Sequence, residues 1–494
     1  MRFSELPDLR AASAPDEPCI KDATTTLSNS AFHNRVLEAA GTFADLGVKA
    51  GDVVAIMLPN QVEFVVAMFA AWRLGAAVTP VKPSLTSKEA THQIVDSGAK
   101  LIVNGAGEVV VPDVRSLSVA ALTGGARHIC KPVDDPTALA LLIYTSGTTG
   151  LPKGVMLDHA NVEAMSEMGR HSLSITTQDH CLLVLPLFHV NAIIVSTLMP
   201  LLAGGRVTLR ERFDIDTFFQ DVEQLRPTYF SAVPTIYALL NALPGEVKPD
   251  TSSLRYGICG AAPASAELLK SFEARYGFPL VEGYGLSEGT CGSTINPVDG
   301  LRKAGTVGLP FVGQRIAIAD SRGVHLPQGE AGEVLIQGPN VMRGYLGKPE
   351  ETAKTIVDGW LRTGDIGRID ADGYLSIVGR LKEMIIRGGE NIYPKEIEDA
   401  LSEFPGVLEA AVIGAPHETL GEVVIAYVAY RPGFTNTAAA LHQHCEDRLT
   451  RYKRPAAINV IDSLPKNAVG KIDKLKLRDL WKQQASTNLG GGNP

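Results

Sequence analysis

The segment YTSGTTGLPKGV, at residues 144–155, limits the folds open to this chain more than any other segment does. An apolar run from Ala138 to Tyr144 leads into hydroxyl residues and glycines, and Lys153 follows. Glycine N–H groups can approach an anion closely, hydroxyls add donors and a lysine adds charge. The segment therefore predicts a phosphate-binding loop that follows a strand. It is not a Walker A loop, because Lys153 is followed by Gly154 instead of Ser or Thr.

Alternating helical and strand patterns over the first 380 residues favour a layered α/β fold. Asn60–Trp72 has the apolar spacing of a helix, and Ala77–Val81 that of a short buried strand. Asp214 is a predicted N-cap for a helix that runs to Arg226. Further strands are predicted at 228–232, 256–259 and 280–282. Because ligands of open α/β sheets bind at the carboxyl ends of strands, the small residues that follow these strands are candidate parts of a site.

The pattern changes after Arg380. Helices are predicted at 394–404 and 437–451, and strands at 407–414 and 422–430. These segments form an α+β unit of about 110 residues, which is enough for an independent small domain. We therefore expect an α/β protein with a large multi-layer domain at residues 1–381, a small domain at 382–494 and a disordered tail from Gln484.

Composition excludes several classes of protein. The chain has 494 residues, of which 45% are hydrophobic, and its net charge of −8 gives no overall attraction to nucleic acid or anionic lipid. The longest apolar stretches, 64–72 and 192–203, are shorter than the ~18 residues of a spanning helix, and the N-terminus has no apolar signal-peptide core. The six cysteines form no CxxC pair, which favours free thiols, and Cys445 lies at helical spacing from Leu441 and Leu449. We expect a cytoplasmic protein with no nucleic-acid partner and no transmembrane segment, and either a monomer or a homodimer is compatible with the sequence.

Two further glycine-rich segments follow predicted strands. CGAAP, at residues 259–263, offers only small side chains, so a flat ring can lie against its backbone, although a packed strand-to-helix turn explains it equally well. EGYGLSE, at residues 282–288, holds an aromatic ring, a hydroxyl and a carboxylate. Tyr284 can stack on a purine, and Ser287 can donate to a phosphate. Glu288 can hold Mg²⁺, which prefers oxygen ligands and bridges to substrate phosphates.

The same segment supports a remote alternative. GLSEG, at residues 285–289, satisfies the GxSxG pattern of the nucleophile elbow in serine hydrolases, with Ser287 as the nucleophile. No HGGG-type oxyanion segment lies upstream, which counts against this interpretation.

Later segments place charged residues beside glycines. Asp365 in WLRTGD and Arg380 in VGRLK suit the hydroxyls of a ribose or a phosphate, although surface ion pairs explain each equally well. Gly388 and Gly389 in RGGENIYP allow a close backbone approach, and a structural turn explains them almost as well. Lys471 in PKNAVGK lies in a basic stretch, which by itself favours a solvated surface.

Together these segments resemble, in order and over essentially the whole chain, the motifs of the adenylate-forming superfamily. This superfamily contains acyl-CoA synthetases, luciferases and the adenylation domains of peptide synthetases. The resemblance implies a large AMP-binding domain and a small mobile lid. It also implies ATP, Mg²⁺ and coenzyme A as cofactors, with a small carboxylic acid as the substrate. Ala261 replaces a glycine usual in the family, and Ser287 replaces a threonine while keeping its hydroxyl.

The resemblance also implies a role for individual residues. Nucleotide binding falls to residues of five segments: Thr145, Ser146, Gly147, Thr148, Thr149, Gly150, Lys153, Gly260, Ala261, Ala262, Gly283, Tyr284, Gly285, Asp365 and Arg380. The catalytic set is Lys471, His189, Ser287 and Glu288, and Glu288 also holds the metal. Lys382, where many relatives have aspartate, is the hinge between the domains. The coenzyme A tunnel is lined by Gly388, Gly389 and Glu390.

Lys471 has a physical reason for its implied role as the adenylation lysine. Displacement of pyrophosphate builds charge on the α-phosphoryl group, and a cation delivered there lowers the barrier. A mobile domain can deliver the cation for one half-reaction and withdraw it for the next. His189 is implied to line the acyl site and gate the thiol, although a lone histidine beside apolar residues is often structural.

The expected acyl pocket consists mostly of small and apolar residues: Phe188, His189, Asn191, Ala192, Val233, Ala261, Gly285 and Cys291. Such a lining fits a monocarboxylic aliphatic or aromatic acid. Malonate-specific relatives place an arginine where this chain has Gly283, which argues against a dicarboxylate substrate without excluding oxalate. Two alternatives stay open: a small-dicarboxylate ligase, for oxalate or malonate, and transfer of the acyl group to the pantetheine of a carrier protein. A luciferase-like oxidation has no support in the sequence.

Overall fold

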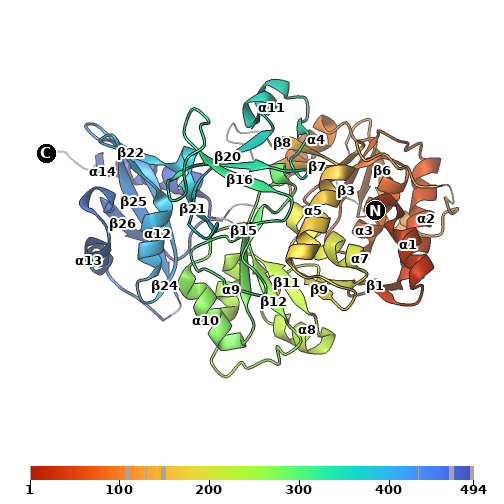
Figure 1. Cartoon of the computed structure of the whole chain (residues 1–494), viewed down its shortest axis with the longest axis horizontal. Helices are drawn as coiled ribbons and strands as arrows, with labels where there is room; N and C mark the ends of the chain where they lie inside the picture. The colour runs from red at the N-terminus through yellow and green to blue at the C-terminus, as the bar shows by residue number, and fades with distance from the viewer. Residues whose placement is uncertain are drawn as a thin grey trace.

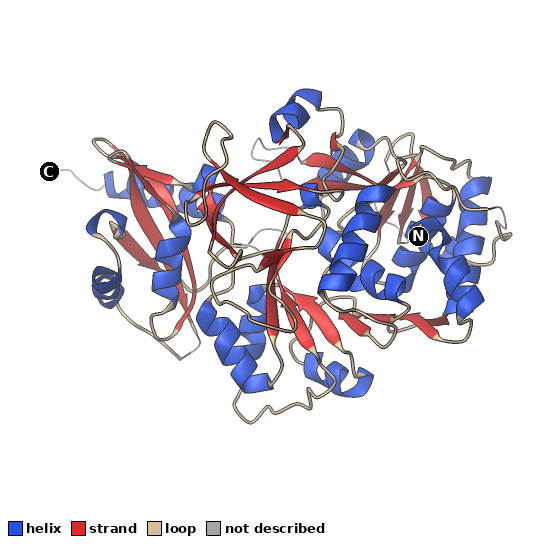
Figure 2. Cartoon of the chain, in the orientation of Figure 1, coloured by secondary structure: helices blue, strands red, loops and turns tan. Residues whose placement is uncertain are grey.

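A computed structural model describes residues 2–105, 111–128, 131–145, 152–431, 433–466 and 472–489. The C-terminal part of the chain, drawn in blue, forms a lobe at one end of the molecule, and the N-terminus lies in the lobe at the other end (Figure 1). Sheets in the larger part are covered by helices in layers (Figure 2). The α/β class and the division into a large and a small part agree with the sequence prediction.

The first sheet of the large part has nine strands, and its central strands run parallel. Its spatial order is β15 (Leu309–Pro310), β14 (Thr294–Ile295), β13 (Leu280–Tyr284), β12 (Tyr256–Cys259), β11 (Tyr229–Ala232), β9 (His180–Leu183), β10 (Arg206–Leu209), β1 (Pro18–Lys21) and β2 (Thr26–Ser28). The carboxyl ends of β11, β12 and β13 therefore lie side by side, which brings the small residues that follow these strands to one edge of the sheet.

The second sheet has seven strands and carries the phosphate-loop candidate. Its order is β18 (Gly344–Tyr345), β8 (Lys153–Asp158), β7 (Leu139–Thr145), β4 (Ala77–Pro80), β3 (Val53–Met57), β5 (Leu101–Asn104) and β6 (Arg115–Ser118). Strands β7 and β8 are antiparallel neighbours, so the loop between them closes a hairpin. Strand β18, from much later in the chain, pairs with β8 and brings Tyr345 beside that hairpin.

Helices of the large part bury apolar residues against these sheets, except α11, which has no buried residue. Their bounds are α1 (Leu6–Ser13), α2 (Asn29–Asp45), α3 (Val62–Arg73), α4 (Ser87–Asp96), α5 (His159–Ser172), α6 (Val190–Ile193), α7 (Met199–Ala203), α8 (Phe218–Leu225), α9 (Pro234–Asn241), α10 (Ala266–Tyr276) and α11 (Pro349–Thr355). Helix α3 is apolar around its whole circumference, and every residue but Glu63 is buried. The Trp72 indole satisfies its N–H by donating to the Ala140 carbonyl at 2.9 Å. A helix with this composition belongs in the centre of a large core.

A third sheet of five strands joins the large part to the C-terminal lobe. It contains β16 (Arg315–Ala319), β17 (Gly332–Gln337), β20 (Trp360–Ile369), β19 (Ile356–Val357) and β21 (Leu375–Arg380). Strands β20 and β21 form an antiparallel pair in which Asp365 stands opposite Arg380. Two residues that lie 15 positions apart in the chain are thereby brought together at one end of this sheet.

The C-terminal lobe has a sheet and a hydrophobic core of its own. The sheet contains β23 (Glu390–Ile392), β22 (Ile385–Arg387), β25 (Gly421–Tyr430), β24 (Val407–His417) and β26 (Ala457–Val460). Helices α12 (Pro394–Ser402), α13 (Ala438–Arg448) and α14 (Lys474–Leu489) accompany it. Cys445 and Leu441 are fully buried in its core, as their helical spacing predicted.

Some element boundaries differ from the sequence prediction. Asp214 does not cap a helix: α8 begins at Phe218 after Thr217, and the Asp214 carboxylate accepts the N–H of Asp216 in the preceding turn at 3.0 Å. The predicted disordered tail was wrong in its first part, because α14 continues to Leu489. Between α6 and α7 the chain forms a π-helix at Ile194–Leu198, a feature that often marks functional sites.

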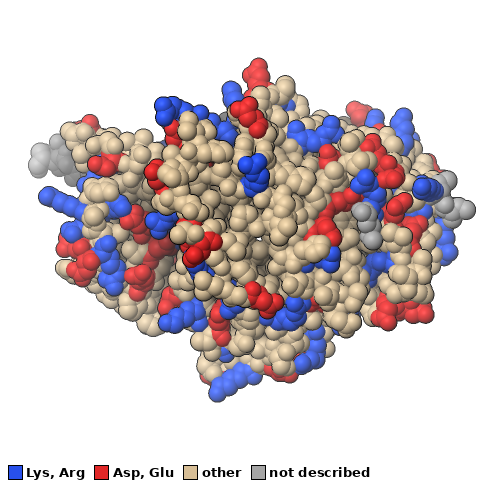
Figure 3. Space-filling model, viewed as in Figure 1, with Lys and Arg blue, Asp and Glu red and all other residues tan. Residues whose placement is uncertain are grey.

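No helix of the described residues is long and apolar enough to cross a membrane. On the face shown in Figure 3, basic and acidic side chains are interspersed over the surface. The cysteines among the described residues, Cys19, Cys181, Cys259, Cys291 and Cys445, are free thiols.

Candidate active site

Lys153 belongs to the predicted phosphate-binding segment and lies in the part of the chain that the structure describes. Thr145 ends β7 and stands opposite Lys153, the first residue of β8. The Lys153 ammonium forms an ion pair with Glu351 of α11 and lies 5.2 Å from the centroid of the Tyr345 ring. The loop residues Ser146, Gly147, Thr148, Thr149 and Gly150 lie outside the described residues.

Glu288 lies on the other side of the same tyrosine. It belongs to a 3-10 turn, Ser287–Gly289, and its Oε1 accepts the Tyr345 hydroxyl at 2.8 Å. Within the described residues no cluster of three or more His, Cys, Asp or Glu side chains is placed to hold a metal ion. A Mg²⁺ ion bound by one carboxylate and by substrate phosphates needs no such cluster. Glu288, beside the Lys153 hairpin, fits this kind of site.

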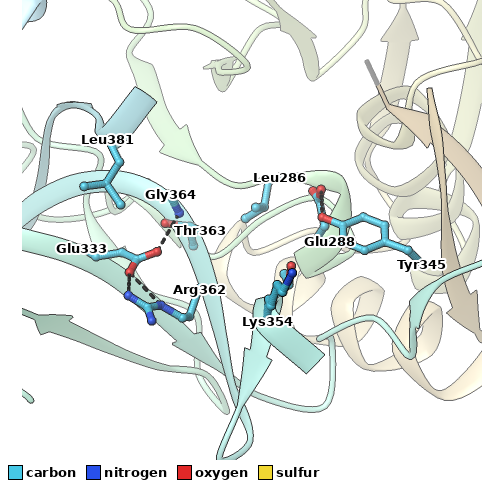
Figure 4. A pocket seen from close by; sticks show the side chains of 10 residues that line it. Leu286, Glu288, Glu333, Tyr345, Lys354, Arg362, Thr363, Gly364 and Leu381 are labelled. Atoms are coloured by element: carbon cyan, nitrogen blue, oxygen red, sulfur yellow. Dashed lines mark hydrogen bonds and ion pairs between the residues drawn. The ribbon is translucent and has the colours of Figure 1, made fainter. Parts of the chain in front are cut away.

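A cavity of about 310 Å³ opens between these residues and the third sheet. Its lining includes Glu288, Tyr345, Lys354 and Arg362. Figure 4 shows the Lys354 side chain between the Glu288–Tyr345 pair on one side and the Glu333–Arg362 pair on the other. Two cations and two carboxylates around one cavity suit a bound anion with its metal ion.

Tyr284 at the end of β13, Asp365 within β20 and Arg380 at the end of β21 come together. The Tyr284 hydroxyl donates to Asp365 Oδ2 at 2.7 Å, and Arg380 Nε lies 2.7 Å from Asp365 Oδ1. The Asp365 side chain is only 3% exposed. Burial and the adjacent Asp365 carboxylate raise the pKa of Tyr284 well above its usual range, so its hydroxyl stays protonated and acts as a donor. This cluster gathers an aromatic ring, a carboxylate and a guanidinium from three separate sequence motifs.

Glycines of the EGYGLSE segment are required by close backbone contacts. A Cβ at Gly285 would clash with the Cys291 carbonyl, and a Cβ at Gly283 would lie 3.0 Å from the Thr294 carbonyl oxygen. Ala261, which replaces a family glycine, has φ = 66°. A left-handed conformation costs a residue with a Cβ about 1–2 kcal/mol, so this substitution leaves the turn strained. Gly260 and Ala262 flank it at the end of β12.

Glu282, the first residue of this segment, is a buried carboxylate, and its side chain went unassigned in the sequence prediction. The residue is 4% exposed, and its Oε1 accepts the Ala264 N–H at 3.0 Å. Burial raises the pKa of Glu282 to about 7, from an ordinary value of 4.5. The folded state therefore holds a proton that the unfolded state releases between these two pH values. Since the native state binds more protons in this range, stability falls as pH rises from 4.5 to 7.

We expect Glu282→Gln to remove this fall in folding stability with rising pH. The amide keeps the shape and can still accept the Ala264 N–H. The variant should gain stability over the wild type as pH rises from 5 to 8, by on the order of 3 kcal/mol at most. Urea unfolding at pH 5 and pH 8 measures this difference. Glu267→Gln, at an exposed site on α10, is the control, and an equal gain in both variants would contradict the prediction.

The acyl-pocket candidates lie at strand ends of the nine-stranded sheet. Phe188 and His189 follow β9, with ring centroids 4.5 Å apart, and His189 immediately precedes α6. Asn191 on α6 accepts the Ser231 hydroxyl at 3.0 Å, which ties the helix to β11. Val233 follows β11 and immediately precedes α9. The structure therefore places these four residues at the ends of two neighbouring strands.

Cys291 and Ala192 complete the predicted lining. Burial raises the pKa of the Cys291 thiol to about 12, so it acts as a small neutral side chain and not as a nucleophile. Ala192 is fully buried. Ser287, the nucleophile of the hydrolase alternative, hydrogen-bonds to no histidine within the described residues, which leaves that alternative without its general base.

The coenzyme A candidates occupy the tip of a hairpin in the C-terminal lobe. Gly388 and Gly389, with φ of 58° and 89°, form the turn between β22 and β23, and Glu390 pairs with Arg387 across it. Their described hydrogen bonds stay within the lobe, where Gly388 N–H donates to Leu420 and Arg387 to the Tyr452 carbonyl. No described contact joins this turn to Tyr284 or Asp365. Lys382 lies in the 3-10 turn Leu381–Glu383 that follows β21, and Lys471 is outside the described residues.

Sequence reasoning missed several side chains around the cavity. Glu351 and Lys354 come from a stretch without glycines, whereas Tyr345 lies between Gly344 and Gly347, a signal that could have drawn attention to it. The Arg362 guanidinium pairs with Glu333, whose other oxygen accepts the Gly364 N–H at 3.1 Å. Only the position of Arg362 within WLRTGD, three residues before Asp365, indicated that it lies near the site.

Family comparison agrees with this geometry. Residues 8–346 match the family described as AMP-binding enzyme, and residues 396–471 match the AMP-binding enzyme C-terminal domain. The chain belongs to the AMP-binding enzyme family and is an ATP-dependent, adenylate-forming acyl-CoA synthetase. Its cofactors are ATP, Mg²⁺ and coenzyme A.

Relatives of known activity align over nearly the whole chain. A feruloyl-CoA synthase of Amycolatopsis sp is 36% identical, over 96% of this chain and 97% of the relative. An oxalate–CoA ligase of Arabidopsis thaliana is 34% identical, over 95% of each. The long-chain-fatty-acid–CoA ligase FadD13 of Mycobacterium tuberculosis is also 34% identical, over 94% of each.

Solved structures are similar in fold and in domain arrangement. ATP-bound MatB from Rhodopseudomonas palustris matches with a TM-score of 0.91 and 31% identity, over 98% of this chain and 99% of that one. MenE from Bacillus subtilis with ATP and magnesium gives 0.87 at 31% identity, over 97% and 99%. Apo MatB gives 0.82 at the same identity and coverage as the ATP-bound form. Since the two MatB structures share one fold, the chain resembles the nucleotide-bound arrangement more than the apo one.

Proposed function

We propose that this enzyme activates a monocarboxylic acid, aliphatic or aromatic, and transfers the acyl group to coenzyme A. The observation that carries the proposal is the Tyr284–Asp365–Arg380 cluster, together with the cavity that Glu288 and Tyr345 line along with the two residues directly before Asp365. In the first half-reaction a carboxylate oxygen attacks the α-phosphorus of ATP, and the bond to pyrophosphate breaks. In the second, the thiol sulfur attacks the acyl carbon, AMP leaves and the thiol proton is released.

The chain's own residues contribute positioning and charge to these steps. We assign the purine to Tyr284, the ribose to Asp365 and Arg380, and the phosphates to Lys153 and the loop before it. Mg²⁺, held by Glu288, supplies neutralisation of phosphate charge. We assign the α-phosphoryl group to Lys471, delivered by rotation of residues 382–494 relative to residues 1–381 about Lys382. After that rotation reverses, the Gly388–Gly389 turn faces the thiol.

The choice of a monocarboxylic acid rests on Gly283 and the apolar lining. Gly283 offers no cation to pair with a second carboxylate, and a side chain there would press on the Thr294 carbonyl oxygen, 3.0 Å from the position of a Cβ. The neutral Cys291 thiol and buried Ala192 add no charge. Ferulate and long-chain fatty acids, named for two relatives, fit such a lining better than oxalate, named for the third. We also propose a cytoplasmic location, which the free thiols support.

ATP–pyrophosphate exchange with a panel of acids tests the proposal. The panel contains saturated acids from about C2 to C18, benzoates, ferulate, oxalate and malonate. We expect exchange with one class of monocarboxylic acid and none with the dicarboxylates. Exchange with no acid would contradict the function, and exchange with oxalate or malonate alone would contradict the substrate class. Comparing free coenzyme A with an acyl-carrier protein as acceptor then decides between the ligase and the carrier-protein alternative.

A further inference from the structure

Lys474, the first residue of α14, lies between two carboxylates in the C-terminal lobe. Its ammonium nitrogen is 2.9 Å from Glu383 Oε2 and 2.8 Å from Glu398 Oε1. The three side chains are between 17% and 25% exposed, so solvent screens these pairs less than it screens surface ion pairs. The two carboxylates raise the pKa of Lys474, and Lys474 together with nearby Arg380 and Lys382 lowers the pKa of Glu383. Lys474 and Glu383 are therefore both charged near neutral pH.

The two carboxylates belong to different parts of the lobe. Glu383 ends the 3-10 turn that contains Lys382, so it stands one residue after the proposed hinge. Glu398 lies on α12, and its Oε1 also accepts the Val412 N–H of β24 at 2.9 Å. A single ammonium group thereby joins the hinge turn, the first helix of the lobe and the start of α14.

Lys474 also lies three residues after Lys471. The chain on either side of residues 467–471 is fixed to the lobe by described contacts. Lys466 forms an ion pair with Glu409 of β24 and a β-bridge with Ile472. The Asp473 N–H donates to the Pro465 carbonyl at 2.8 Å.

We propose that Lys474 is a positioning residue for adenylate formation, acting through its ion pair with Glu383. This inference rests on the proposed role of Lys471 and of the hinge at Lys382. When the lobe rotates about Lys382, the pair fixes the hinge turn to the chain segment that leads to Lys471. The segment therefore keeps its position relative to the hinge turn while the lobe rotates. Misplacement of a reacting group by about 1 Å can cost about 100-fold in rate, so loss of the pair should impair the half-reaction that needs Lys471.

A purely structural role for the Lys474 pairs predicts a different result. If the pairs only stabilise the lobe, their loss lowers stability and affects both half-reactions alike. Glu383→Gln separates these roles, because it breaks the connection to the hinge turn while the Lys474–Glu398 pair remains. Lys474→Met removes both pairs, and Lys474→Arg keeps the charge. Lys476→Met is the matched control, since Lys476 lies on the same helix, has a side chain that is 63% exposed and, among the described residues, pairs at 3.8 Å with Asp473.

The experiment measures the two half-reactions separately in the full-length chain. For Glu383→Gln and Lys474→Met we expect the kcat of ATP–pyrophosphate exchange to fall about 10- to 100-fold with little change in the KM for ATP. Thioester formation from supplied acyl-adenylate should stay within about threefold of wild type. Lys474→Arg should restore most of the exchange, and Lys476→Met should resemble wild type. Unchanged exchange in Glu383→Gln, or equal loss in both half-reactions, overturns the inference.

Assays of Lys471→Ala in parallel show whether a negative result refutes the role of Lys474 or the role of Lys471. If Lys471→Ala loses exchange while Glu383→Gln keeps it, only the role of Lys474 is refuted. If Lys471→Ala keeps exchange, the assignment of Lys471 fails and the inference fails with it.

Discussion

Lys471→Ala abolishes adenylate formation and spares thioester formation: this is the largest effect that we expect from a single substitution. Charge builds on the α-phosphoryl group only as pyrophosphate leaves, so a cation placed there stabilises that transition state and not the later attack by the thiol. ATP–pyrophosphate exchange should fall by about 1,000-fold or more, while thioester formation from supplied acyl-adenylate changes by less than about threefold. Single-turnover assays of each half-reaction measure the two rates independently.

Lys476→Ala serves as the control for Lys471→Ala, because it removes an exposed lysine from the same basic stretch. A nonspecific charge effect would lower exchange in both variants. Equal loss of the two half-reactions in Lys471→Ala would contradict the assignment, since it would indicate damage to the fold or to nucleotide binding in general.

The similarity to nucleotide-bound relatives bears on this prediction. The chain as a whole agrees better with ATP-bound MatB than with apo MatB. In that arrangement Lys395 of α12 lies close enough to the buried Glu282 to act on its charge, and Asp399 opposes it. Charges on the lobe therefore act on a carboxyl group of the large part whose pKa burial raises to about 7.

The segments to which we assign nucleotide binding were predictable because their chemistry is local. Glycines, hydroxyls and charged residues in YTSGTTGLPKGV and EGYGLSE are adjacent in the sequence, and strand patterns before them placed them at sheet edges. The cluster of Tyr284, Asp365 and Arg380 confirms that segments far apart in the chain meet, as the order of motifs implied. The role of each residue stays a prediction until the assays above are done.

The contacts around Tyr345 were not predictable from the residues alone. Tyr345 lies beside Lys153 only because β18 adds to the edge of the second sheet, a long-range pairing with no local signal. The pair of Lys474 with Glu383 spans 91 residues and depends on the packing of the whole lobe. Asp214 failed as a cap for a local reason, since its carboxylate is used in a turn before the helix begins. The contacts of Tyr345 and Lys474 depend on residues far away in the chain, which no local sequence pattern indicates.

Asp365→Asn should impair both half-reactions, in contrast to Lys471→Ala. Asp365 has one oxygen on Arg380 and the other on the Tyr284 hydroxyl, both at 2.7 Å, and is almost fully buried. An asparagine keeps the shape but loses the charge, and its NH₂ group must face a donor from one of these partners. The proposed ribose hydroxyls also lose a charged acceptor. Since the nucleotide stays bound from ATP to AMP, both steps need this carboxylate.

We expect kcat/KM for ATP to fall about 100- to 1,000-fold in Asp365→Asn, with most of the change in KM, and thioester formation from supplied acyl-adenylate to fall as well. Asp372→Asn is the matched control, because Asp372 lies in the exposed turn between β20 and β21 and, within the described part of the chain, its ion pair is with Lys303. Circular dichroism and thermal unfolding check that both variants fold. A normal KM for ATP in folded Asp365→Asn would place the ribose elsewhere. Loss of exchange with thioester formation intact would assign Asp365 to the same step as Lys471 instead of to nucleotide binding.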